Sequence, residues 1–75
     1  MKITIEKKNS KHNIAFDIEI DQHRKVCELK TLLYLKTKVP FCFQELWFND
    51  ILLKDDDRLD TNHTKLTLVV RLKRH

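Results

Sequence analysis

The sequence predicts an α+β fold, in which one mixed, five-stranded sheet carries a single main helix across one face. Three observations support this prediction. Segment 65–72 alternates apolar residues on one face of an extended strand, without Gly or Pro. Segment 1–6 alternates in the same way at the start of the chain. Between Val26 and Leu33 the apolar residues recur at helical spacing instead. We expect the two terminal strands to lie side by side in the middle of the sheet.

Length and composition are those of one small domain. Seventy-five residues with 41% hydrophobic content support a single packed core, and the net charge of +4 is modest. Cys27 and Cys42 are too far apart for a C-x-x-C redox or zinc motif. No apolar run reaches membrane-spanning length, so we expect no membrane partner. An intracellular location, cytoplasmic or nuclear, fits this cysteine usage best.

The first part of the chain predicts a hairpin. Strand 1–6 is followed by a polar turn, 7–12, in which Asn9 is the residue best suited to a left-handed backbone, since the chain has no Gly. Segment 13–20 then alternates cleanly, which makes it the second strand. Its inward positions are all apolar: Ile14, Phe16, Ile18 and Ile20.

A helix follows the polar link 21–24. Its inward positions have helical spacing: Val26, Leu29 and Leu33. Three charged side chains on it are available for solvent: Glu28, Lys30 and Lys36. Three further apolar residues lie partly off the inner stripe: Leu32, Tyr34 and Leu35. Pro40 requires the helix to end by Val39, because the residue before a proline disfavours helical backbone.

The second part of the chain predicts three more strands. Segment 43–48 is the first of them, with Leu46 and Phe48 inward. Its outward side chains are those of Phe43, Glu45 and Trp47. A turn at Asn49-Asp50 leads into a short strand, 51–53. Segment 54–64 is irregular and acidic, with Leu59 as its apolar anchor, and the terminal strand follows.

The chain resembles ubiquitin from Met1 through Leu72. Segment 66–72 is close to ubiquitin's terminal strand, and Lys38-Val39-Pro40 stands where ubiquitin has Gly-Ile-Pro. The resemblance implies a β-grasp fold, with a ubiquitin-like domain over 1–72 and a basic tail over 73–75 that we expect to lead into a longer chain. The inner positions correspond in type: Ile3, Ile5, Ile14, Phe16, Ile18, Val26, Leu29, Leu33, Leu46, Leu53, Leu59, Leu66 and Leu68.

The chain departs from the ubiquitin pattern at its end. Conjugated relatives end in Gly-Gly, because the activating enzyme acts on an unhindered terminal glycine, whereas this chain contains no Gly at all. Arg71 matches the family's contact with the activating enzyme, but Lys73-Arg74-His75 follow it. The resemblance therefore implies a non-conjugated domain, unless the chain was cut from a longer precursor.

The resemblance also implies a surface for partner proteins. Trp47 takes the position of the central isoleucine of ubiquitin's main recognition face. Val69 takes the place of that face's valine, and Thr67 stands at its histidine. We expect Phe43 to lie beside Trp47 on the same strand. Tryptophan is a frequent interface anchor, so this apolar patch is the predicted partner site.

Further residues surround that predicted site. Glu45 and Arg71 should form a cross-strand ion pair at its rim, worth roughly 0.2–1 kcal/mol. A second family patch lies next to the tail and comprises Val39, Val70 and Leu72. An alternative for the phenylalanines is that Phe41 and Phe43 fold back over the helix end as a satellite core.

The sequence favours a binding function. We expect a monomeric protein-interaction module of the ubiquitin/proteasome system, bound by a proteasomal receptor, a ubiquitin-binding helix or a ubiquitin-pathway enzyme. The alternative is an RNA- or anion-binding domain that uses Arg71, Lys73 and Arg74. No nucleophile–base pair, phosphate loop or clustered metal ligands are evident, so we expect neither an enzyme nor a cofactor or metal; a site shared by His23 and Cys27 is only a remote alternative.

Overall fold

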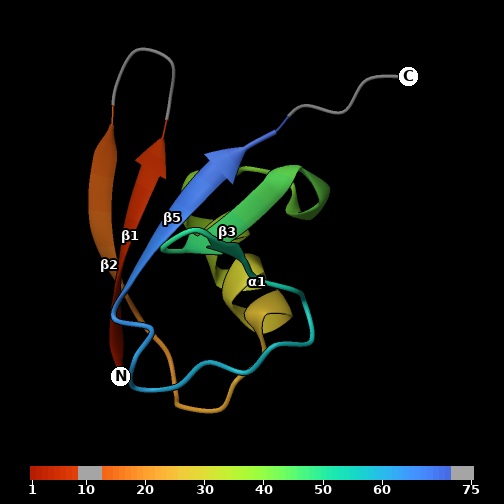
Figure 1. Cartoon of the computed structure of the whole chain (residues 1–75). Helices are drawn as coiled ribbons and strands as arrows, with labels where there is room; N and C mark the ends of the chain where they lie inside the picture. Colours follow the sequence, from red (N-terminus) through yellow and green to blue (C-terminus); the bar gives the residue numbers. More distant parts are fainter. Residues whose placement is uncertain (9–12, 72–75) are drawn as a thin grey trace.

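The computed structural model describes residues 1–8 and 13–71. The predicted turn at Asn9 and the end of the chain from Leu72 lie outside these residues. Figure 1 shows the order of the elements along the chain, which are the strands and helices β1 (Lys2–Lys8), β2 (Ile14–Glu19), α1 (Val26–Thr37), the short 3-10 helix η1 (Phe41–Phe43), β3 (Gln44–Phe48), β4 (Ile51–Leu52) and β5 (Lys65–Val70).

The five strands form one mixed sheet in the order β2-β1-β5-β3-β4. β1 and β5 run parallel at its centre, with Ile5 opposite Leu66, and the other neighbours are antiparallel. In Figure 1 α1 crosses one face of this sheet. The prediction that the terminal strands are adjacent and central is therefore confirmed, as is the α+β, β-grasp fold.

The core lies between α1 and the inner face of the sheet. Val26, Leu29 and Leu33 of the helix are completely buried there. The sheet and its connections contribute the other members of the cluster, which are Ile3, Ile5, Ile18, Ile20, Leu46, Leu53, Leu59, Leu66 and Leu68. The apolar helix residues predicted off the inner stripe are exposed: Leu32, Tyr34 and Leu35.

The helix ends where the sequence predicts. Lys38 adopts the left-handed conformation with a φ of 64°, and its backbone N–H donates to the Tyr34 carbonyl at 2.7 Å. This geometry closes the last turn of many helices, usually at a glycine. Thr37 supports the same turn, because its hydroxyl donates to the Leu33 carbonyl at 2.7 Å and accepts the Val39 N–H at 3.2 Å.

Two predictions need correction at the periphery of the sheet, namely the inward orientation of Ile14 and the inclusion of Phe43 in a strand. Ile14 is 49% exposed, because it opens the edge strand beside the C-terminal end of α1, where little covers it. Phe43 does not belong to a strand. Its N–H donates to the Pro40 carbonyl at 2.9 Å, and this tight turn places it at the end of η1. β3 begins one residue later, at Gln44.

Lys30 is buried, contrary to the solvent exposure predicted for it. Only 8% of the residue is exposed, and its ammonium lies 2.8 Å from the Asp55 carboxylate. The same ammonium stands 5.2 Å from the centre of the Phe41 ring. The long lysine stem packs along the core edge while its charged end reaches an acidic partner in the connection after β4. Glu28 and Lys36 are exposed as predicted.

Candidate partner-binding surface

The outer face of the sheet, opposite α1, carries the predicted partner site. Trp47 in β3 lies directly opposite Thr67 in β5 and Leu52 in β4. Glu45 lies opposite Val69, which makes Val69 a diagonal neighbour of Trp47. The register thus gathers four side chains from three strands, which we call the Trp47 face: Trp47, Leu52, Thr67 and Val69.

Exposure on the Trp47 face increases toward the sheet edge. Trp47, Thr67 and Val69 are half-buried, whereas Leu52 is 45% exposed. Leu52 was not among the predicted site residues. The two-residue turn at Asn49-Asp50 was a usable signal, since it pairs Phe48 with Ile51 and therefore Trp47 with Leu52. The Trp47 face is therefore a row of side chains on three neighbouring strands, and Trp47 does not protrude from the sheet alone.

The predicted ion pair between Glu45 and Arg71 is present. Arg71 Nε donates to Glu45 Oε2 at 2.7 Å, and Trp47 Nε1 donates to Glu45 Oε1 at 3.3 Å. The hydrogen bond from Arg71 is the main reason that the pKa of Glu45 lies below its ordinary value. One carboxylate therefore connects the basic rim to the indole and orients the tryptophan ring.

The other predicted site residues are more dispersed. Phe43 is half-buried, and its carbonyl accepts the Arg71 N–H at 2.8 Å. Along the chain, Glu45 lies between Phe43 and Trp47. Val70 lies opposite Gln44, which places it on the other face from Trp47. In the second patch Val39 is 9% exposed and offers little surface to a partner. The remaining predicted residues lie outside the described part of the chain: Leu72, Lys73 and Arg74.

Gln44 positions β3 from the inner side. Its side chain is buried, and Nε2 donates to the carbonyls of Lys30 and Val39, both at 3.0 Å. These bonds tie the start of β3 to the helix and to the segment after it. The sequence pattern contained the signal, because alternation with Leu46 and Phe48 puts Gln44 on the inner face.

The cysteines and the potential metal ligands of the described residues do not form a further site. Cys27 is half-buried and Cys42 exposed, and both are free thiols. Within residues 1–8 and 13–71 no three His, Cys, Asp or Glu side chains are grouped to hold a metal ion. A helix long and apolar enough to span a membrane is likewise not found in this part of the chain.

Comparison with known proteins finds a similar solved structure but no similar sequence. Neither a protein-family model nor a curated protein matches the chain. A chain from the crystal structure of ATBAG1 in complex with HSP70 superposes with a TM-score of 0.74 and 22% sequence identity. The match covers 92% of this chain and 40% of that chain, so this chain spans less than half of the matched protein's length. With the strand order above, the likeness supports the ubiquitin-like fold.

Proposed function

We propose that this chain is a non-conjugated ubiquitin-like module that binds a protein partner through the Trp47 face. The observation behind this proposal is the row formed by Trp47, Thr67 and Leu52 across three strands. α1 covers the opposite side of the sheet, so the row faces outward (Figure 1). We propose binding rather than catalysis, with the domain acting as a monomer.

The Trp47 face has the physical character of a binding anchor. Tryptophan supplies a large apolar area together with one N–H donor, a combination enriched at interface hot spots. The bond from Trp47 Nε1 to Glu45 limits the freedom of the ring before a partner arrives. A partner then loses less conformational entropy in ordering the anchor, which favours affinity. The Glu45–Arg71 pair provides a polar rim beside it.

The partner class follows from the correspondence with ubiquitin's recognition face. A proteasomal receptor, a ubiquitin-binding helix or a ubiquitin-pathway enzyme fits this role, and an intracellular location of the module is part of the proposal. The complex of ATBAG1 with HSP70 supports a protein partner in general. Because Arg71 is already paired with Glu45, attraction to acidic partners should be weaker than on a face with free basic residues.

The RNA- or anion-binding alternative receives less support. Arg71 is the one member of that basic set in the described structure, and its guanidinium is engaged by Glu45 at 2.7 Å. Because Arg71 is already paired with the Glu45 carboxylate, this ion pair competes with any contact between Arg71 and a phosphate. Protein binding is therefore the function that we propose.

A titration of the isotopically labelled domain tests the proposal. A ubiquitin-interacting helix is added to one sample and a short RNA to another, and amide and indole signals are followed by NMR. We expect the helix to shift the indole signal of Trp47 and the amides of Thr67 and Val69. Salt-sensitive shifts with RNA at Arg71, with no response of the Trp47 face to the helix, would contradict the proposal.

A further inference from the structure

The Trp47 face continues across the sheet onto β1 and β2. Thr67 lies between Trp47 on one neighbouring strand and Glu6 on the other, and Glu6 in turn lies opposite Ala15. Paired residues on neighbouring strands project from the same face of a sheet, so these side chains form one row. We call it the Trp47 row, and across the strands of Figure 1, from β4 to β2, it comprises Leu52, Trp47, Thr67, Glu6 and Ala15.

Glu6 is the one charged member of the Trp47 row. Toward the β4 edge the row is apolar, and it ends there at Leu52, which is 45% exposed. Glu6 lies two strands from Trp47, which is roughly 10 Å at the usual spacing of neighbouring strands. A partner that lies along the row therefore meets apolar side chains first and a carboxylate further on.

Glu6 is held less closely by its cation than Glu45 is by Arg71. The Glu6 carboxylate lies 3.9 Å from Lys8 Nζ, and 33% of the Glu6 side-chain surface is exposed. Glu45, by comparison, is engaged by Arg71 at 2.7 Å. An exposed ion pair of such length contributes little, so the Glu6 carboxylate is available to a cation from a partner.

Two lysines flank the Trp47 row, one on each side of Glu6. Lys8 follows Glu6 by two residues along β1, and Lys65 lies opposite Thr4, two residues before Glu6. Two residues along a strand span about 6.6 Å, whereas the radius of a helix with its side chains is about 5–6 Å. A helix whose axis follows the row therefore lies between the two lysines, with Glu6 beneath it.

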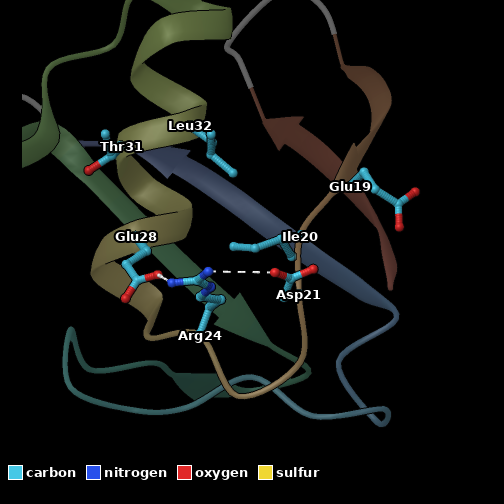
Figure 2. A pocket seen from close by; sticks show the side chains of 7 residues that line it. All are labelled: Glu19, Ile20, Asp21, Arg24, Glu28, Thr31 and Leu32. Carbon is cyan, nitrogen blue, oxygen red and sulfur yellow. Dashed lines mark hydrogen bonds and ion pairs between the residues drawn. The ribbon is translucent and has the colours of Figure 1, made fainter.

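The carboxylates of the hollow beside α1 are paired differently. This hollow of about 420 Å³ lies between the end of β2 and α1, and in it Arg24 stands between Asp21, at 3.5 Å, and Glu28, at 3.3 Å (Figure 2). One guanidinium thus serves both carboxylates, and a cation from a partner would have to compete with it. Glu28 is exposed like Glu6 but lies on the helix side of the sheet, which makes it a matched control.

We propose that the protein partner of the Trp47 face carries a lysine or arginine that pairs with Glu6. The proposal rests on the function proposed above and names the partner's chemistry: an amphipathic helix with an apolar residue on Trp47 and a cation two helical turns away. Two turns advance a helix by about 11 Å, which matches the roughly 10 Å between Trp47 and Glu6. Charge complementarity of this kind contributes to the choice of partner more than to affinity.

The net charge of the chain makes this preference distinctive. At +4 the chain as a whole attracts acidic peptides. A preference for a basic helix runs against that overall attraction and requires a local carboxylate. At about 0.15 M salt the screening length is about 8 Å, so under these conditions the local contact dominates over distant charges.

Two synthetic helices test the proposal. Both have a leucine at the centre and another leucine one turn away on either side. The residue two turns from the centre, at both ends, is lysine in the first helix and glutamate in the second, so either direction of binding is covered. NMR titrations at about 0.15 M salt follow the indole signal of Trp47. We expect the lysine helix to bind about threefold more tightly or better. Equal affinities, or tighter binding of the glutamate helix, would overturn the proposal.

Variants of Glu6 locate the preference. Glu6→Gln should reduce the ratio of the two affinities by about two- to fivefold, the range of one exposed ion pair, and Glu6→Lys should reverse the preference. Glu28→Gln changes the net charge by the same amount as Glu6→Gln and should leave the ratio unchanged. A preference for the lysine helix that survives Glu6→Gln would assign the cation to another carboxylate and contradict the proposal.

The signals of the Trp47 face separate this proposal from the function on which it rests. If both helices shift the signals of Trp47 and Thr67 with equal affinity, the face binds helices but Glu6 does not select them. If neither helix shifts these signals, the binding of helices by the Trp47 face and the selection by Glu6 fail together.

Discussion

Glu45 connects the basic rim of the Trp47 face to the tryptophan ring and also contributes to stability. Its carboxylate accepts hydrogen bonds from Arg71 and from Trp47, one on each oxygen. The ion pair with Arg71 follows from the sequence, because long side chains at diagonal positions of adjacent strands are within reach of each other; Glu45 lies opposite Val69, and Arg71 comes two residues later. The bond to the indole did not follow from it, since that bond depends on the rotamer of the ring. One side chain thus sets both the charge of the rim and the orientation of the anchor.

Substitution of Glu45 should give a pH-dependent loss of stability. The pKa of Glu45 is lowered in the folded state, chiefly by the hydrogen bond from Arg71. Its contribution is therefore full above the unfolded-state value of about 4.3 and is lost as the pH falls through the folded-state value. Glu45→Gln should lower the free energy of unfolding by about 0.2–1 kcal/mol at neutral pH. Urea unfolding at neutral pH and through the acid range checks this; a loss that persists unchanged at the acid end would contradict it.

Asp55 should matter far more than its neighbour Asp56. Asp55→Ala leaves the buried ammonium of Lys30 without its carboxylate at 2.8 Å. Stranding a buried donor should cost about 1–3 kcal/mol of unfolding free energy. Asp56→Ala is the matched control, because Asp56 is exposed and forms no ion pair with a described residue, and it should stay within about 0.5 kcal/mol. Denaturant unfolding of the two variants measures the difference, and equal losses would contradict a specific role of the Lys30–Asp55 pair.

At the scale of elements, the sequence predicts the helices and strands themselves better than the segments that connect them. The end of α1 was predictable, since Pro40 and the run Lys36-Thr37-Lys38 both mark it. The segment from Phe41 was not, because a three-residue 3-10 turn and the start of a strand look alike in an apolar stretch. The burial of Lys30 was missed for a related reason: helical spacing gives its direction, but only the fold brings Asp55 within reach.

The C-terminal end of α1 offers a stabilising substitution. Lys38 has a φ of 64°, a conformation that disfavours residues with a Cβ. Lys38→Gly should raise the unfolding free energy by about 0.5–1 kcal/mol, the left-handed penalty less the added chain entropy of glycine. Asn49→Gly is the control, since Asn49 has a φ of 56° but asparagine tolerates it, and the gain there should be smaller. Thermal unfolding compares the two; destabilisation by Lys38→Gly would contradict the strain.

At the scale of the molecule, the alternating patterns at the two ends of the chain were sufficient to predict the sheet. Apolar positions with a period of two identify Ile3, Ile5, Leu66 and Leu68 as inner residues, and all are buried. Ile14 obeys the same pattern yet is exposed, because a pattern defines the face of a strand but not how far the helix covers it. Leu52 joins the Trp47 face through the register of the β3–β4 hairpin, which the two-residue turn at Asn49-Asp50 fixes.

Truncation of a core leucine of α1 should cost far more stability than truncation of a surface leucine. Leu29 is fully buried, so Leu29→Ala should lower the unfolding free energy by about 2–5 kcal/mol, a large share of the stability of a small domain. Leu35 is 61% exposed, and Leu35→Ala should change it by no more than about 0.5 kcal/mol. Urea unfolding followed by Trp47 fluorescence measures both. A marked loss for Leu35→Ala would show that the helix surface is covered.

The affinity of Trp47→Ala for a purified proteasomal ubiquitin receptor tests the central claim most directly. The dissociation constants of the unmodified domain, Trp47→Ala and Leu35→Ala are measured by calorimetry, after amide spectra establish that each variant is folded. We predict at least a tenfold loss for Trp47→Ala, as truncation of an interface anchor gives, and no change for Leu35→Ala. Unchanged affinity of folded Trp47→Ala, or no binding by the unmodified domain, would contradict the account.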